Sequence, residues 1–149
     1  MALDQQELNE NQVIEEFGRQ LLVPGISEAG QNNLLRKNIL LIGLGALGTI
    51  ASQYLVRAGI GSITLLDFDR VSLSNLHRQI NYNKNDIDQY KSEISKKILL
   101  NINSVTKIVQ YPISFESFLE KNDFDNIDYI FDCSDNYVTK TNSSLFAKS

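Results

Sequence analysis

The sequence has few of the residues that mark specialised classes of protein. Its 149 residues include only two prolines and eight glycines, which excludes collagen-like and low-complexity chains. A single cysteine, Cys133, excludes an intrachain disulfide and a cysteine-based zinc site within one copy. We therefore expect no zinc and a reducing, cytoplasmic compartment. The first residues have no basic or apolar stretch of the kind found in signal peptides, so we expect no secretion signal there. Hydrophobic residues make up 42% of the chain, enough for one domain over residues 1–149.

Positive charge is also scarce. Fourteen Lys and Arg stand against 18 Asp and Glu, a net charge of −4 at pH 7. This balance excludes a nucleic-acid partner bound by general phosphate neutralisation. The uncharged segment 38–56 approaches the length of a membrane span, but its glycines and polar residues favour a strand followed by a helix. We expect no membrane association, and any anion site must be local.

Hydrophobic patterns predict helices and strands in alternation. Two N-terminal helices, at 13–22 and from a Ser27 cap to about 37, are expected to form an arm over residues 1–37. Strands are expected at 38–42, 62–66, 106–111 and 127–132, and further helices after residue 45, between about 88 and 103, at 114–121, and from 137 to the chain end. This alternation predicts an α/β, doubly wound, Rossmann-like parallel sheet of about four strands in the order 3-2-1-4, with helices on both faces.

A glycine-rich motif follows the first predicted strand. Gly43, Gly45 and Gly48 fit the G-x-G-x-x-G pattern between a strand and a helix. The first two glycines let the chain turn and approach a phosphate, the third permits close helix packing, and the helix N-terminus offers amides to an anion. A tight turn without a ligand is the alternative. The helix is expected to carry one apolar stripe: Leu47, Ile50, Ala51, Leu55 and Ala58.

Acidic and basic residues follow the other predicted strands. Asp67 ends the second strand, where an acidic residue commonly receives ribose hydroxyls, so to this point NAD fits as well as ATP. Asp67 and Asp69 are alternatively turn residues or helix caps. Arg78 and Lys91 supply more positive charge than one pyrophosphate needs, which favours a triphosphate. Asp135, just past the fourth strand, is a hard oxygen ligand suited to Mg²⁺. Each of these charges taken alone would be interpreted as a solvated surface group.

In combination, these residues give the sequence a specific resemblance. It resembles the ThiF, MoeB and HesA family of sulfur-carrier adenylyltransferases, which are related to ubiquitin-activating enzymes. The resemblance implies an enzyme that uses ATP and Mg²⁺ to adenylate the C-terminal glycine of a small ubiquitin-like sulfur carrier, acting as a homodimer. The matching segments lie between about residues 14 and 142: Gly18-Arg19-Gln20, 43–48, 51–55, 65–69, 75–79, Lys91 and 132–136.

The resemblance also implies residue roles. Asp67 would hold the ribose, Asn75, Arg78 and Lys91 the phosphates, and Asp135 the magnesium. Asp69 and Gln79 would complete the nucleotide site, and Arg19 would reach the triphosphate from the neighbouring subunit. The chain departs from the family pattern where Phe17, with Gly18 after it, stands for a tyrosine before Arg19, and where Lys140 stands for an arginine. Family members continue into a carrier-binding half, so we expect this chain to represent the nucleotide-binding half.

Two other hypotheses stay open. An NAD-binding dehydrogenase domain is disfavoured by Arg78, Lys91 and Asp135, whereas a non-catalytic module for nucleotide binding or dimerisation fits a short chain. Cys133, at the end of a predicted buried strand, is expected to pack there and not to act as a nucleophile. His77 is expected to be a spacer or solvent-exposed. A sheet that ends after four strands predicts an open edge and an exposed apolar patch near Leu145 and Phe146.

Overall fold

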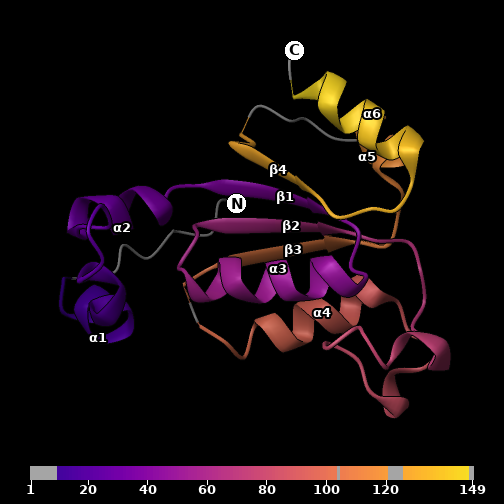
Figure 1. Cartoon of the computed structure of the whole chain (residues 1–149), viewed down its shortest axis with the longest axis horizontal. Helices are drawn as coiled ribbons and strands as arrows, with labels where there is room; N and C mark the ends of the chain where they lie inside the picture. The colour runs from indigo at the N-terminus through magenta and orange to yellow at the C-terminus, as the bar shows by residue number, and fades with distance from the viewer. Residues whose placement is uncertain (1–9, 104, 121–125, 148–149) are drawn as a thin grey trace, which may run out of the picture.

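The computed structural model of the chain describes residues 10–103, 105–120 and 126–147. Its centre is a four-stranded parallel sheet in the order β3-β2-β1-β4, as predicted. In register, Leu40 of β1 lies opposite Thr64 of β2 and Ile130 of β4. Because all strands run in one direction, their carboxyl ends meet at one edge of the sheet (Figure 1). The strands are β1 (Asn38–Ile42), β2 (Ser62–Leu66), β3 (Lys107–Tyr111) and β4 (Tyr129–Asp132).

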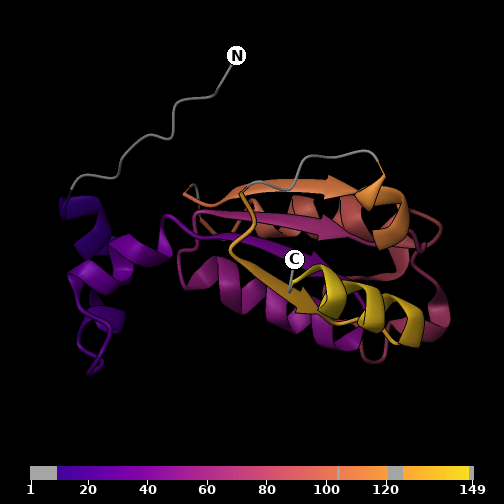
Figure 2. The ribbon, with the colours of Figure 1, turned by 90° about the horizontal axis from the view of Figure 1, so that it is seen from above.

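Helices cover both faces of the sheet (Figures 1 and 2). Alternate residues of β1 explain this: Ile39 and Leu41 pack with α3 (Ala46–Arg57) and α4 (Lys91–Leu99). Leu40 and Ile42 pack on the other face with Phe115 and Phe118 of α5 (Phe115–Leu119), beside α6 (Tyr137–Phe146). A strand buried on both faces is apolar along its buried length, and β1 is apolar and buried from Ile39 to Ile42, which supports the predicted fold.

The helical arm lies beyond the amino ends of the strands (Figure 2). It consists of α1 (Glu10–Leu21) and α2 (Glu28–Leu34), the latter capped by Ser27 as predicted. The buried Gln31 donates to the Ala58 carbonyl at 3.0 Å, and Gln20 donates to Gln31 at 2.6 Å. These bonds fix the arm to the end of α3. In the described part of the chain, no helix is long and apolar enough to cross a membrane.

Several predicted element boundaries are wrong because residues near the predicted ends form hydrogen bonds with distant parts of the chain. The second helix ends at Leu34 and not at 37, since the carbonyls of Leu34 and Lys37 accept from Gly61 and Ser62 at the start of β2. The fourth helix ends at Leu99 and not at 103, where Asn103 instead donates to the Val56 carbonyl. The strands begin at Lys107 and Tyr129. Predicted helix ends at 121 and 149 lie outside the described residues.

The predicted apolar stripe of α3 does not face the core as a whole. Leu47 and Ile50 are exposed, as is Tyr54, which is 71% exposed. Ala51 and Leu55 of the predicted stripe do pack against the core. The fully buried residues of the helix are Gly48, Thr49, Ser52 and Val56. Leu47, Ile50 and Tyr54 therefore form an outward surface, the α3 apolar face.

The outer strand of the sheet, β4, carries only part of the predicted exposed apolar patch. Tyr129 and Phe131 on the edge strand β4 are exposed, and so is Leu145 on α6. Phe146 is not part of this surface, because its ring packs edge-on against Phe115 with centroids 6.2 Å apart. The predicted patch is thus correct for Leu145 and wrong for Phe146.

Candidate functional site

The glycine turn, residues 43–48, lies at the carboxyl end of β1. A different physical reason accounts for glycine at each of its three positions. Gly43 has a φ of +86°, a left-handed conformation that favours glycine. A Cβ on Gly48 would lie 1.8 Å from the Gly43 carbonyl oxygen. A Cβ on Gly45 would meet nothing nearer than the Gln79 amide nitrogen, at 3.8 Å. Folding therefore requires glycine at 43 and 48, whereas position 45 borders open space at the N-terminus of α3.

Asp67 holds this turn from the end of β2. Its Oδ2 accepts from the Leu44 N–H at 2.6 Å, and its Oδ1 accepts from the Asp69 N–H at 2.7 Å. Burial raises the pKa of Asp67 even though both amide donors and the nearby Lys91 oppose the change. Asp67 therefore follows β2, as predicted, and bonds directly to the glycine turn.

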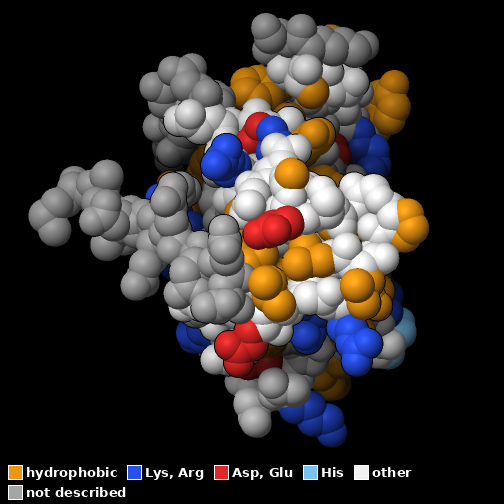
Figure 3. All heavy atoms as spheres, turned by 90° about the vertical axis from the view of Figure 1, so that its left-hand side faces the viewer, with side chains coloured by type: hydrophobic (Ala, Val, Ile, Leu, Met, Phe, Trp, Pro, Cys, Tyr) orange, Lys and Arg blue, Asp and Glu red, His pale blue; other side chains and the backbone are white. Residues whose placement is uncertain are grey.

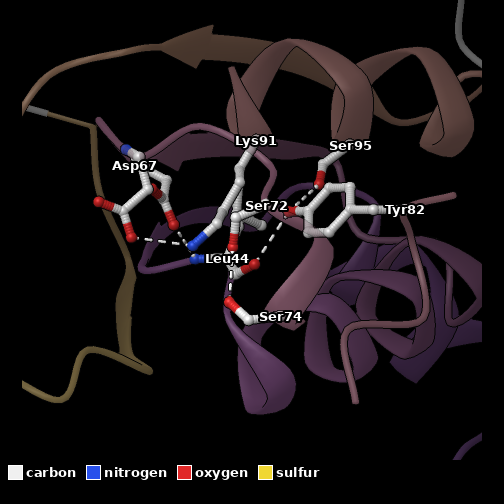
Figure 4. Close-up of polar contacts among 8 residues, drawn as sticks. Leu44, Asp67, Ser72, Ser74, Tyr82, Lys91 and Ser95 are labelled. Atoms are coloured by element: carbon white, nitrogen blue, oxygen red, sulfur yellow. Dashed lines mark hydrogen bonds and ion pairs between the residues drawn. The ribbon is translucent and has the colours of Figure 1, made fainter. Parts of the chain in front are cut away.

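Lys91 is buried at the N-terminus of α4, with 4% of its surface exposed. Its ammonium donates to Asp69 Oδ2 at 2.8 Å, and its amide donates to the Asp69 carbonyl at 3.0 Å. A buried ammonium requires such a partner. Lys91 is thus a fixed cation beside the glycine turn (Figure 4) and not a solvated surface charge.

The connection from β2 to α4 carries the other predicted phosphate ligands. Asn75 is half-buried in a short 3-10 turn, Leu73–Asn75, and a second such turn spans Lys84–Asp86. Arg78 is exposed and donates to the Ser74 carbonyl at 3.1 Å, beside the exposed His77.

Gln79 on this connection is 4% exposed, and its Oε1 accepts no hydrogen bond. A buried amide oxygen without a donor costs about 1–3 kcal/mol. This oxygen is itself enclosed, and the atom of Gln79 that lies beside Gly45 is the side-chain nitrogen Nε2.

The carboxyl end of β4 completes this edge of the sheet. Asp132 accepts from the hydroxyls of Ser134 and Ser143, each at 2.6 Å. Burial opposes ionisation of Asp132, but these hydrogen bonds together lower its pKa. Burial and the Asp132 charge raise the pKa of Cys133. Cys133 is half-buried after the edge strand β4, and not at the end of a buried strand as predicted. Asp135 is exposed, and the described residues contain no cluster of three or more His, Cys, Asp or Glu side chains suited to a metal.

Arg19 lies away from all of these residues. It belongs to α1, at the end of the sheet opposite the glycine turn (Figure 1). There it is exposed beside a shallow hollow of about 340 Å³ formed with Ile14, Glu15, Glu16, Gly18 and Leu22. Figure 3 looks at this end of the molecule, where hydrophobic side chains are exposed between charged ones. The predicted nucleotide residues other than Arg19 all lie on the segments that follow β1, β2 and β4.

Sequence reasoning missed Tyr82. Its hydroxyl donates to the Leu44 carbonyl at 2.9 Å, so it contacts the glycine turn directly. The available signal was its position as the one aromatic residue in the polar run 81–86. A tyrosine in such a run is a candidate for burial with its hydroxyl bonded.

Comparison with known proteins identifies the family. The ThiF family matches residues 17–145. The chain is 39% identical over 127 residues to the adenylyltransferase and sulfurtransferase MOCS3 of Dictyostelium discoideum, covering 85% of this chain and 30% of that protein. It is 39% identical over 124 residues to the sulfur carrier protein ThiS adenylyltransferase of Escherichia coli, covering 83% and 49%. The chain thus spans less than half the length of these curated relatives.

Solved structures share the fold. The E. coli tRNA N6-threonylcarbamoyladenosine dehydratase TcdA, in complex with AMP, superimposes with a TM-score of 0.78 at 21% identity, covering 94% of this chain and 57% of that one. E. coli MccB, in complex with ATP, gives a TM-score of 0.57 at 29% identity, covering 60% and 27%. The predicted relationship is confirmed: this chain belongs to the ThiF family.

Proposed function

We propose that this chain binds ATP with Mg²⁺ at the carboxyl edge of its sheet and takes part in adenylating the C-terminal carboxylate of a ubiquitin-like sulfur-carrier protein. The observation that carries the proposal is the convergence of the glycine turn, the buried Lys91 ammonium and the Gln79 side chain in a ThiF-family chain. The names of the curated relatives support the reaction, and the MccB complex with ATP supports the nucleotide.

The residues at this edge fit a nucleoside triphosphate. The open space at Gly45 leaves room for phosphate oxygens beside the positive end of α3. Asp67 offers acceptors for ribose hydroxyls, the Gln79 side-chain nitrogen borders the space at Gly45, and Asp69 sets the position of Lys91. The phosphates would be bound by Asn75, Arg78 and Lys91.

Asp135 is the carboxylate proposed to hold Mg²⁺. A single protein carboxylate suffices for this ion when phosphates and water complete its shell. Bound there, Mg²⁺ would neutralise charge on the triphosphate.

The proposed reaction needs little proton transfer. The carrier carboxylate oxygen forms a bond to the α-phosphorus while the bond from that phosphorus to the bridging oxygen breaks, and pyrophosphate leaves with the electron pair. The nucleophile is already an anion, so no general base is required. The contribution of this chain is then to position the phosphates and to neutralise their charge with Arg78 and Lys91.

The proposed assembly is a cytoplasmic homodimer in which Arg19 completes the partner's site. Arg19 lies beyond the amino ends of the strands, opposite the proposed site of its own chain, and the α3 apolar face offers a surface for a second copy. The single cysteine suits a reducing compartment.

We expect Mg·ATP to raise the melting temperature of the chain and NAD to leave it unchanged, since a ligand that binds only the folded state stabilises it by mass action. A concentration of 100 times Kd stabilises by about 2.7 kcal/mol. The Asp135→Asn variant should keep its response to ATP but lose most of the extra shift that Mg²⁺ adds. Differential scanning fluorimetry measures both effects. A larger rise in melting temperature with NAD than with Mg·ATP would contradict the proposal. Turnover is tested separately, by measuring pyrophosphate exchange in the presence of a carrier protein that ends in Gly-Gly.

A Gly45→Ala substitution should separate ligand binding from folding. The new Cβ meets only open space and the end of Gln79, so the melting temperature should stay within a few degrees of the original. The methyl group would occupy the space proposed for phosphate, and we expect ATP to bind at least about tenfold more weakly. Isothermal titration calorimetry measures this change. Unchanged ATP affinity would mean that the nucleotide does not approach this turn.

A further inference from the structure

A series of side-chain hydrogen bonds connects α3 and α4 to the glycine turn. Asn81, Tyr82 and Ser95 are all buried. The bonds are Gln53 Nε2 to Asn81 Oδ1 at 2.7 Å, Asn81 Nδ2 to Ser95 Oγ at 3.2 Å, Ser95 Oγ to Tyr82 Oη at 3.1 Å, and Tyr82 Oη to the Leu44 carbonyl at 2.9 Å.

Chemistry fixes the direction of every bond in this series. The Leu44 carbonyl can only accept, so Tyr82 gives it the one hydrogen of its hydroxyl. Ser95 must then donate to the Tyr82 oxygen. The Ser95 oxygen accepts in turn from the amide nitrogen of Asn81, which can only donate. All donors therefore point toward the glycine turn, an arrangement in which successive hydrogen bonds polarise one another.

Leu44 is held at both of its backbone polar groups (Figure 4). Asp67 accepts from its N–H, and Tyr82 donates to its carbonyl. The Leu44 carbonyl and the Gly45 N–H belong to one planar peptide unit and point in opposite directions. By holding that carbonyl, Tyr82 directs the Gly45 N–H away from itself. Tyr82 also bonds to Gln79, because its backbone amide donates to the Gln79 carbonyl at 3.2 Å.

We propose that Tyr82 is a positioning residue: its hydroxyl orients the Leu44–Gly45 peptide so that the Gly45 N–H faces the nucleotide phosphates. The part that concerns phosphate rests on the proposed ATP site. The hydroxyl thereby couples the connection that carries Asn75, Arg78 and Gln79 to the glycine turn. Burial raises the pKa of Tyr82, so the hydroxyl remains a donor across the physiological pH range.

The test is a Tyr82→Phe variant of the whole chain, which removes the hydroxyl and keeps the ring. We expect its ATP affinity to fall about five- to tenfold, as for the loss of one buried hydrogen bond. Without ligand, amide exchange measured by NMR should speed up by a similar factor at Leu44, whose N–H donates to Asp67. The matched control is Tyr129→Phe, an exposed tyrosine at the amino end of β4, which should change neither quantity.

A Ser95→Ala variant separates positioning from general stability. It removes the donor to Tyr82 but leaves the bond from Tyr82 to Leu44, so it should lower the melting temperature while ATP affinity falls less than twofold. Equal ATP affinity in Tyr82→Phe and the wild type would overturn the proposal, as would unchanged amide exchange at the turn. If the wild-type chain binds no ATP, the proposed function fails. In that case the exchange rates alone decide whether Tyr82 orders the turn.

Discussion

A Gly48→Ala variant should be destabilised by at least about 3 kcal/mol, the largest stability effect that we expect from one methyl group in this chain. The added Cβ would lie 1.8 Å from the Gly43 carbonyl oxygen and 2.9 Å from its carbon. Alanine is favoured over glycine in a helix by about 1 kcal/mol, but this gain is smaller than the cost of moving α3 away from the turn. Urea denaturation followed by circular dichroism measures the change.

The control for this experiment is Gly30→Ala in α2. A Cβ there would lie 3.6 Å from the Gly25 carbonyl oxygen, an ordinary contact. This variant should be as stable as the original chain or more stable by up to about 1 kcal/mol. If Gly48→Ala were equally stable, the close approach of α3 to the glycine turn would be wrong.

Mixing an Arg19→Ala chain with an Arg78→Ala chain should restore tight Mg·ATP binding that neither variant has alone. Each substitution removes a charged donor to phosphate and should weaken binding by about 10- to 100-fold. In a hybrid dimer, one site has Arg78 from one subunit and Arg19 from the other. After random exchange of subunits, about a quarter of all sites should be complete. Calorimetric titration should then show a tight and a weak class of site.

The outcome distinguishes the two possible positions of Arg19. If Arg19 serves its own subunit, every site in the mixture lacks one arginine and no tight class appears. Native mass spectrometry confirms that hybrids have formed. Arg36→Ala is a suitable control, because Arg36 is an exposed residue just after α2 and its loss should leave ATP binding unchanged. Absence of the tight class despite hybrid formation would contradict action across a dimer.

Local sequence patterns were sufficient to predict the fold. The strand patterns at 38–42 and 62–66, the glycine motif between them and the Ser27 cap each act over a few residues. Right-handed crossovers then leave few strand orders, and the observed order follows. Element ends were less accurate. They depend on bonds to distant segments, such as the bond from Asn103 to the Val56 carbonyl.

The residue types of the candidate site were also readable from the sequence, but their environments were not. Lys91 and Arg78 look alike as cations in the sequence, yet Lys91 is buried on Asp69 and Arg78 is exposed. Tyr82 could not be assigned to Leu44, because 38 positions separate them. Helical spacing also placed Leu47 and Ile50 in a stripe with Leu55, although α3 buries its glycine and hydroxyl residues instead.

The sequence by itself determined the order of elements, the sheet class and the composition of the carboxyl edge, because periodicity, turn chemistry and apolar content are local properties of the chain. Only the tertiary structure decided which side chains lose their water and which polar atoms meet. The burial of Lys91, the two bonds that hold Leu44 and the unpartnered oxygen of Gln79 all arise where the 71–90 connection packs against the glycine turn. Such contacts depend on distances across the fold, and no local pattern specifies them.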